Sequence, residues 1–132
     1  MGKMATHLAN KVLDAIFNNS SLSYANVYLS LHTDAPGDNG ANEVTAGENT
    51  YARKQTAPAD WDSAAAKAIT TLSPFEWEDM PGVTVTHIGV WDALSDGNFL
   101  WGGPLTVSKT VPAGETLRFK AGEINAEIDP SE

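Results

Sequence analysis

The chain has 132 residues, 42% of them hydrophobic, and this length is typical of one domain that buries its own core. Its 17 acidic and 8 basic residues give a net charge of -9, which repels a phosphate backbone and argues against nucleic acid as a partner. The absence of cysteine excludes disulfides, thiol catalysis and cysteine-ligated metal. We therefore expect a single domain over residues 1–132 that folds without cross-links.

The beginning of the chain predicts an amphipathic helix over residues 6–17. Apolar residues recur there at helical spacing, and the polar stretch 18–21 provides a stop. Polar residues also interrupt the apolar stretch, which excludes the continuous apolar core of a signal peptide, and no run approaches the about 20 apolar residues of a membrane helix. We expect this helix to lie against a sheet or over one of its edges, and partner binding is the alternative.

Short strands and loops follow the helix. Residues 25–33 alternate apolar and polar side chains, which predicts a half-buried strand, and the polar stretch 34–43 predicts a surface loop. Residues 51–57 predict a second strand. Residues 64–68 could support a helical turn. The family resemblance given below instead implies a loop there, followed by a strand over residues 69–75.

The stretch 83–105 predicts a central antiparallel hairpin. Both of its halves are rich in β-branched, aromatic or other apolar residues, and Asp96-Gly97 between them is a strong signal for a turn with positive φ. The apolar residues change phase along the first half of this stretch. We therefore expect a β-bulge near His87 or Gly89, because one extra residue moves the following side chains to the other face.

Three further strands are predicted at about 105–111, 116–120 and 124–128, separated by turns that contain glycine. Turn signals every eight to twelve residues are typical of β-sandwiches and barrels. The sequence therefore predicts a mainly β protein, an antiparallel, jelly-roll-like β-sandwich with one short N-terminal α-helix. The residues expected in its core are Leu29, Leu31, Ile88, Val90, Leu117 and Phe119.

Residues that could ligate a metal are scattered along the sequence. The loop 34–43 contains five oxygen-bearing side chains suited to calcium, but its spacing differs from that of a regular calcium loop, so a solvated acidic loop is the simpler interpretation. His7, His32 and His87 lie on different predicted elements, and no two have the four-residue spacing of a zinc-binding helix. We expect no metal and no cofactor.

The sequence offers little that indicates catalysis. Glu76, Glu78 and Asp79 near Trp77 resemble paired carboxylates beside a sugar-stacking ring, although acidic residues next to a turn are usually solvated. The chain contains no nucleophile-elbow, phosphate-loop or dinucleotide-binding motif. We therefore expect no catalytic residues and no enzymatic activity, with a metal-dependent hydrolase as the alternative.

The four tryptophans, Trp61, Trp77, Trp91 and Trp101, are the candidate interaction surface. Their rings could form a carbohydrate-binding platform, but we expect at least two of them in the core or at a subunit contact. Trp91 and Trp101 lie on opposite arms of the hairpin, where they could pair or pack on the same neighbour. A carbohydrate-binding receptor module is therefore an alternative function.

Several segments follow one another along the chain, among them NKVLDAIF, TYARKQTAP, TVTHIGVWDA and the C-terminal stretch from GNFLWGGPL to FKAGEI. Segments in this order resemble a family of small tailed-bacteriophage structural proteins commonly labelled tail fibre proteins. The similarity runs from about Leu8 to Asp129, and its most specific pieces are residues 28–43, 51–53, 87–92 and 109–115.

This resemblance implies a non-enzymatic virion structural protein, made in the host cytoplasm and carried on the particle surface. Both a capsid decoration or cement protein and a tail-fibre protein fit it. The resemblance also implies self-association, with a homotrimer as the expected form, and contact with other phage structural proteins such as major capsid or tail proteins. Nucleic acid and membrane are not expected partners. The chain has no shaft-like tract, and we expect residues 1–4 and 129–132 to be free to reach a neighbouring subunit.

Overall fold

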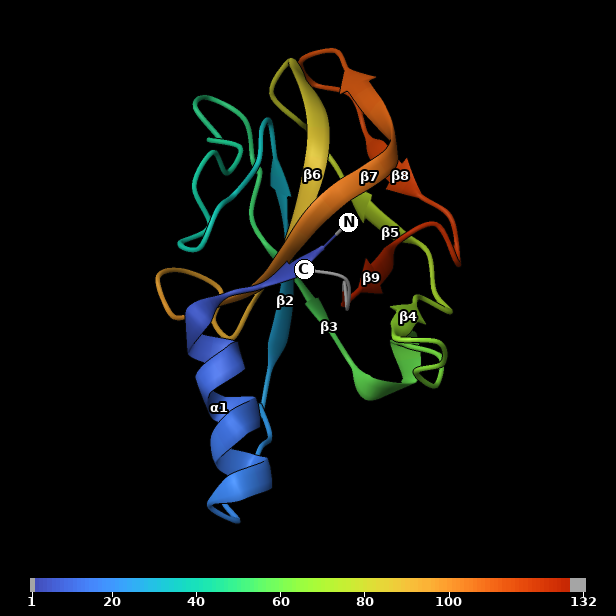
Figure 1. Ribbon diagram of the computed structural model, residues 1–132. Helices are drawn as coiled ribbons and strands as arrows, with labels where there is room; N and C mark the ends of the chain where they lie inside the picture. The colour runs from blue at the N-terminus through green and yellow to red at the C-terminus, as the bar shows by residue number, and fades with distance from the viewer. Residues whose placement is uncertain (1, 129–132) are drawn as a thin grey trace.

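The computed structural model describes residues 2–128, which form nine strands, one α-helix and one short 3-10 helix (Figure 1). Strands make up 39% of the protein and helix 12%, so the prediction of a mainly β fold is confirmed. In chain order the elements are β1 (Lys3–Met4), α1 (Thr6–Phe17), β2 (Val27–His32), β3 (Lys54–Thr56), the 3-10 helix (Pro58–Asp60), β4 (Ala68–Thr70), β5 (Phe75–Trp77), β6 (Val83–Trp91), β7 (Phe99–Val111), β8 (Leu117–Phe119) and β9 (Asn125–Glu127).

The strands form an antiparallel β-sandwich. One layer is a five-stranded sheet in the order β1-β7-β6-β2-β3, and the other consists of two separate two-stranded ribbons, β4-β9 and β5-β8. The paired strands β6 and β7 cross the centre of the molecule (Figure 1). The antiparallel sandwich of the sequence prediction is therefore confirmed, with its second layer divided in two.

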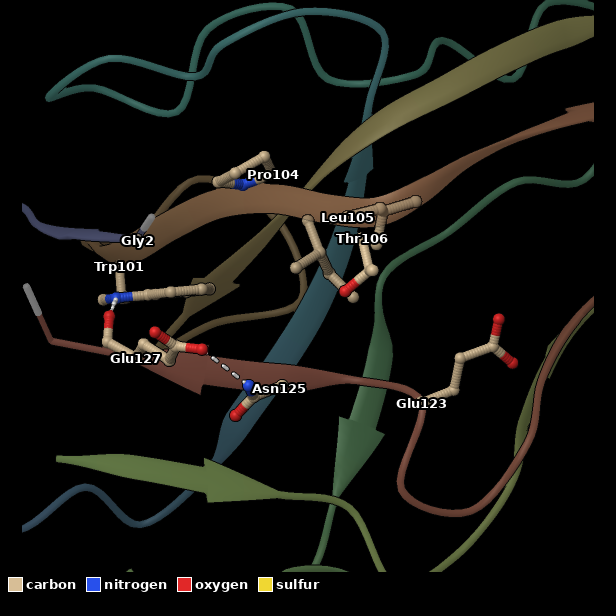
Figure 2. A pocket seen from close by; sticks show the side chains of 9 residues that line it. Gly2, Trp101, Pro104, Leu105, Thr106, Glu123, Asn125 and Glu127 are labelled. Atoms are coloured by element: carbon tan, nitrogen blue, oxygen red, sulfur yellow. Dashed lines mark hydrogen bonds between the residues drawn. The ribbon is translucent and has the colours of Figure 1, made fainter. Parts of the chain in front are cut away.

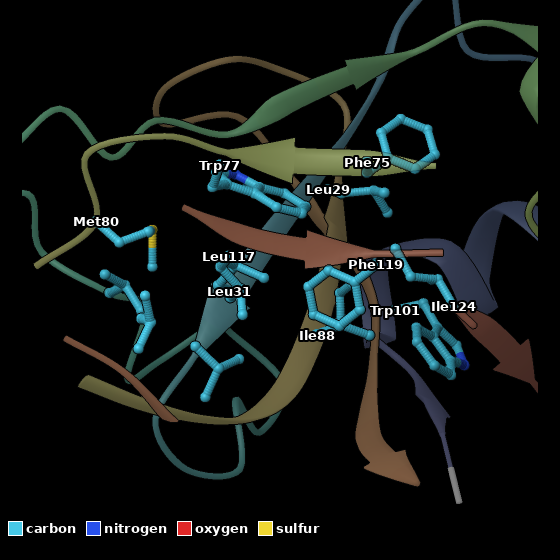
Figure 3. Packing of buried hydrophobic residues seen from close by; sticks show 13 residues of the cluster. Leu29, Leu31, Phe75, Trp77, Met80, Ile88, Trp101, Leu117, Phe119 and Ile124 are labelled. Atoms are coloured by element: carbon cyan, nitrogen blue, oxygen red, sulfur yellow. The ribbon is translucent and has the colours of Figure 1, made fainter. Parts of the chain in front are cut away.

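The core lies between these layers and is built by alternate residues of the strands (Figure 3). Leu29 and Leu31 point into it from β2, because successive side chains of a strand face opposite sides. From the second layer, the rings of Trp77 and Phe119 meet edge to face with centroids 5.7 Å apart. Five of the six predicted core residues are buried, and the sixth, Val90, is half-buried and packs against the same cluster.

The predicted central hairpin is present as β6 and β7. Asp96 and Gly97 both have positive φ, 55° and 76°, as expected for an Asp-Gly turn. The connection is longer than a tight turn, however, because it comprises residues 92–98. The carboxylate of Asp92 accepts hydrogen bonds from the backbone N–H and the side-chain amide of Asn98, which closes this loop.

The predicted bulge is confirmed, because the register between β6 and β7 shifts just before His87. A second shift in register occurs between Val90 and Trp91, so that Trp101 lies opposite Val90 and Trp91 lies opposite Phe99. Trp91 packs edge-on against Phe99, with ring centroids 5.1 Å apart, whereas Trp101 belongs to the main core. The two tryptophans therefore neither pair nor share a cluster.

Two predicted strands are wrong in their bounds. The strand predicted at about 105–111 is not separate, because β7 runs without a break from Phe99 to Val111. Residues 69–75 were expected to form a continuous strand, but β4 ends at Thr70 and β5 begins at Phe75. Pro74 lies between them and cannot donate a hydrogen bond to a sheet ladder, which explains the break. The two short strands consequently belong to different ribbons of the second layer.

Residues 3 and 4 are not free, which corrects part of the expectation for residues 1–4, while residue 1 lies outside the described residues. Lys3 and Met4 form β1 and pair with Gly102 and Trp101 of β7. They cover part of an edge that would otherwise expose unpaired backbone groups. The expectation for residues 129–132 lies outside the described residues.

The helix α1 was predicted correctly in its bounds and wrongly in its packing. None of its residues is buried, and it projects past the end of the sheet rather than lying across it (Figure 1). Its first turn contacts β7 through the preceding residue Ala5, whose N–H donates to the Leu100 carbonyl at 2.8 Å. Within residues 2–128, no helix has the length and apolar character needed to cross a membrane.

Candidate functional site

The four candidate tryptophans do not share one surface. Trp77, Trp91 and Trp101 are buried, whereas Trp61 is half-buried, so at least two lie in the core as expected. Each indole N–H donates to an internal acceptor: Thr56 Oγ1 for Trp61, the Ala52 carbonyl for Trp77, Ser30 Oγ for Trp91 and the Glu127 carbonyl for Trp101. Trp61 is therefore the one of the four that keeps appreciable ring surface for a partner.

A buried chain of hydrogen bonds connects β2 with β6 on the face of the sheet opposite the main core. Trp91 Nε1–H donates to Ser30 Oγ at 2.9 Å, Ser30 Oγ lies 2.7 Å from His32 Nε2, and His32 Nδ1 lies 2.7 Å from the Ala41 carbonyl oxygen. Because a carbonyl oxygen only accepts, Nδ1 carries the proton and Nε2 accepts from the serine hydroxyl. Every member of the chain is thus satisfied with a neutral His32.

A serine hydroxyl donating to a histidine nitrogen resembles a nucleophile and its general base. Ser30 and His32 are both fully buried, however, and the indole N–H of Trp91 already occupies one lone pair of the hydroxyl oxygen. A nucleophile must reach its substrate, so the pair acts here as a structural link between strands. Sequence alternation placed both side chains on the solvent-facing side of the strand. The missed signal is Gly89, which pairs with Ser30 across the strands and leaves room for both polar side chains.

Stability is expected to depend on pH through His32. Burial lowers the pKa of His32 below its ordinary value of 6.5, and the Ala41 carbonyl and the Glu43 carboxylate offset only part of this effect. Between the lowered pKa and 6.5 the unfolded chain binds the proton and the folded chain does not, so the free energy of unfolding decreases as the pH falls below 6.5.

We therefore expect unfolding at a lower urea concentration at about pH 5.5 than at about pH 7.5. The variant His32→Gln, although less stable at both values, should lose most of this difference because it cannot titrate. An equal pH dependence in the two proteins would contradict the role assigned to His32.

Glu43 and Arg53 form an ion pair next to this chain. The Arg53 guanidinium donates to both carboxylate oxygens of Glu43, with Nη2 3.0 Å from Oε1 and Nε 3.1 Å from Oε2. It also stacks on Trp91, with its central carbon 3.6 Å from the ring centroid, and its Nη1 donates to the carbonyls of Ala93 and Asp96. Arg53 therefore attaches the turn of the central hairpin to the sheet.

Tyr51 extends the same polar network. Its hydroxyl donates to Glu43 Oε2 at 2.8 Å and accepts from the backbone N–H of Leu31 at 3.0 Å. Burial and the adjacent Glu43 carboxylate raise the pKa of Tyr51, which keeps the hydroxyl protonated as a donor. Three of the segments that carry the sequence resemblance meet in this network. They supply Glu43, Tyr51 with Arg53, and Trp91.

The loop 34–43 is exposed over most of its length, as expected of a solvated acidic loop, and specific contacts also hold it in place. Asp38 Oδ1 accepts hydrogen bonds from the backbone N–H and the hydroxyl of Thr6, at 2.8 and 3.0 Å. A carboxylate is favourable at this place because the first turn of a helix carries partial positive charge. Asn42 Nδ2 donates to the Ala35 carbonyl at 2.9 Å and closes the loop on itself.

The side chains considered as metal ligands come together only in part. His7 lies on α1, whereas the buried His32 pairs with His87 across β2 and β6, and the Nδ1 of His87 bonds with the hydroxyl of Thr86. Over residues 2–128, no three histidine, aspartate or glutamate side chains are placed to hold a metal ion.

The candidate carboxylates and the candidate stacking ring face opposite ways. Trp77 is buried, while Glu76 and Glu78, its neighbours on either side, are exposed because side chains alternate along a strand. Glu76 pairs with Arg118 at 3.4 Å. The structure thus does not place a sugar-stacking ring beside Glu76, Glu78 and Asp79, and this hypothesis is wrong.

A substitution at Gly40 can test how closely the loop 34–43 packs on Trp91. Gly40 has φ of 73°, and a Cβ added there would overlap the Trp91 ring and lie 2.9 Å from Phe99. Gly37 in the same loop has φ of 65°, but a Cβ added there meets open space. Alanine at either position carries a left-handed backbone cost of about 1–2 kcal/mol.

We expect Gly40→Ala to lower the free energy of unfolding by about 1–3 kcal/mol more than Gly37→Ala, because only Gly40→Ala adds a collision with the rings. Urea denaturation of the two variants measures this difference directly. Equal losses would mean that the loop can move away from Trp91 at no cost.

Two recesses flank Trp101. Figure 2 shows the smaller one, of about 180 Å³, with Glu123, Asn125 and Glu127 along its lining. These polar groups are already partnered: Asn125 Nδ2 donates to Glu127 Oε1 at 2.9 Å, and Glu123 Oε2 lies 2.6 Å from the Lys109 ammonium. This recess therefore presents few free polar groups to a ligand.

The larger recess is an open, almost entirely apolar hollow of about 400 Å³, here called the apolar groove. Leu8 of α1 lines one part of it, and Ile69 of β4 and Ile128, which follows β9, line another. Trp61 also contributes to the lining, and Lys67 is the charged residue among those that line it. The groove assembles residues from distant parts of the chain, so no local sequence pattern could have predicted it.

The fold is thus a β domain in which the polar clusters described above are engaged in internal bonds and an apolar groove is open at the surface. A family model described as Podophage GP4 fiber I protein gp80 matches residues 3–127. The chain belongs to this family of phage fibre proteins, which confirms the resemblance seen in the sequence. No curated protein matches the chain.

Proposed function

We propose that the protein is a structural component of the phage particle, of the tail-fibre type, and that it acts through surface contacts rather than catalysis. The family match carries this proposal, because it extends over residues 3–127 and the matching family is described as a fibre protein. The buried Ser30–His32 pair and the Glu43–Arg53 network support it, since their polar atoms bond to the protein itself. Capsid decoration or cementing is the alternative position on the virion.

The proposed partners are further copies of the chain and other phage structural proteins, in the tail or in the major capsid. The net charge of -9 supports a position outside the DNA-filled head, because it disfavours contact with a phosphate backbone. We propose neither nucleic acid nor membrane as a partner.

Copy number per particle tests this function. Quantitative mass spectrometry of purified particles should find a few to a few tens of copies if the protein belongs to the tail. Hundreds of copies would instead identify a capsid decoration protein, and antibody labelling in electron micrographs would show the same distinction by position. If the protein is absent from purified particles, the virion function is wrong.

The carbohydrate-binding alternative now depends on Trp61. Trp77 offers no ring to a sugar because it is buried in the core. The groove beside Trp61 is almost entirely apolar, whereas a sugar site needs polar groups to bond the hydroxyls. This chemistry favours an apolar protein surface as the occupant.

A further inference from the structure

The helix α1 presents a large uncovered apolar surface. Leu13, Ile16 and Phe17 are 53%, 67% and 77% exposed, and no residue of the helix is buried. An isolated helix of about 12 residues is marginal in water, and most helices in proteins are stabilised by packing of an apolar face. The first turn of α1 is anchored to the body by Ala5 and Asp38, whereas its last turn is closed by local hydrogen bonds from Asn18 and Ser20 to Asp14.

The uncovered surface of the helix continues into the apolar groove. Leu8 lines the groove, and Val12 and Ile16 follow it at steps of four residues, which places the three on the same side of the helix. The body of the protein covers only the beginning of this stripe. The uncovered apolar side of α1, here called the ridge, and the apolar groove are therefore parts of one apolar surface.

The total surface area supports a missing contact of ordinary interface size. The protein exposes 7538 Å². A compact monomer of 14.0 kDa exposes about 6,700 Å². The excess of about 800 Å² equals the area that one partner buries in a standard protein interface.

We propose that the apolar groove of one copy receives the C-terminal half of α1 from a second copy. Each chain carries both a projecting ridge and a recess of the same chemistry, so every copy can donate and accept. The contact must be apolar in nature, because two chains of net charge -9 repel each other. The inference names the interface for the self-association in the proposed function and is independent of the position on the virion.

One charged residue fits this arrangement. The last turn of α1 contains no basic residue to offset the partial negative charge of the helix end. Lys67 at the groove would supply a cation to the helix of the second copy. Lys67 is held at this place by a two-residue turn between Ala65 and Ala68, in which Ala66 and Lys67 both have positive φ, 53° and 67°.

Sedimentation velocity of the purified full chain tests the proposal. We expect the wild-type protein to sediment as a multiple of 14.0 kDa and Ile16→Asp to sediment as a monomer with an unchanged β-type circular dichroism spectrum. Ile16 makes no buried contact, so its replacement should leave the fold intact. Val107→Asp is the matched control, because Val107 is 71% exposed on β7 and lies outside the groove. The Val107→Asp protein should therefore remain associated.

Cross-linking tests the identity of the contact. The chain has no cysteine, so a mixture of Phe17→Cys and Ile128→Cys can form a ridge-to-groove cross-link only between two copies. We expect a short bismaleimide to join these two variants efficiently and to join Phe17→Cys with Val107→Cys poorly. Equal yields in the two mixtures would overturn the proposed contact.

A wild-type protein that remains monomeric at high concentration would overturn the proposal of a second copy as the occupant. If Ile16→Asp then also failed to enter particles, the occupant would be another virion protein. The copy number per particle tests the proposed function separately, because it requires no association of the free chain.

Discussion

Arg53→Ala should reduce the free energy of unfolding by about 3–5 kcal/mol, because it removes one partner of a largely buried ion pair and leaves the other uncompensated. The side chains of Arg53 and Glu43 are only 9% and 21% exposed. The variant also loses the stacking on Trp91 and two hydrogen bonds to carbonyls of the hairpin loop. Chemical denaturation at neutral pH measures the loss.

Arg118→Ala is the matched control. Arg118 pairs with Glu76 at 3.4 Å, but the two side chains are 59% and 45% exposed, and such surface pairs contribute about 0–1 kcal/mol. Arg53→Lys should be intermediate, because lysine keeps the charge and loses the planar double contact with the carboxylate. Similar small losses for Arg53→Ala and Arg118→Ala would contradict the structural importance of the network.

Phe119→Ala should cost about 3–5 kcal/mol by opening a cavity between the two layers. Phe119 is 1% exposed, and its ring contacts Trp77 edge to face. The Lys109 ammonium lies 4.5 Å from the centroid of the Phe119 ring, and this contact would be lost as well. The near-ultraviolet circular dichroism of the tryptophans should weaken together with the denaturation midpoint.

Val107→Ala provides the comparison for Phe119→Ala. Val107 is an exposed residue of β7, and a surface substitution of this kind should change the stability by no more than about 0.5 kcal/mol. A Phe119→Ala protein as stable as Val107→Ala would mean that the two layers close over the missing ring.

The periodic parts of the sequence predicted the fold well. Alternation in β2 identified Leu29 and Leu31 as core, and Asp96-Gly97 located the central hairpin, because both signals are local. The division of the second layer into two ribbons was not predicted by the sequence pattern. The break at Pro74 separates two strands of three residues each, and elements so short carry almost no periodicity.

The candidate site was predicted much less completely, because it depends on contacts between distant residues. Trp91 was singled out for its ring, yet its main contacts are Arg53 and Ser30, 38 and 61 positions away in the chain. His32 was placed on a solvent-facing side, whereas the loop 34–43 buries it. Alternation indicates which side chains share a face but not what covers that face.

The amphipathic pattern of α1 shows the same limit in another form. The spacing of Leu13, Ile16 and Phe17 correctly indicated an apolar face, and the expectation that the sheet of the same chain covers it was wrong. Periodicity reports that a face requires burial. It does not report whether the covering surface belongs to the same molecule.

The attachment of α1 determines how a mechanical load would pass through the protein. A pull on the chain ahead of the helix enters the body first at β1 and then at Ala5 and Thr6, which are held by the Leu100 carbonyl and the Asp38 carboxylate. The adjoining β1 has only two residues paired with β7, so it should separate early under force. The load would then reach the loop that covers Trp91 before it reaches the main core, and the sandwich should stay folded while its N-terminal segment extends.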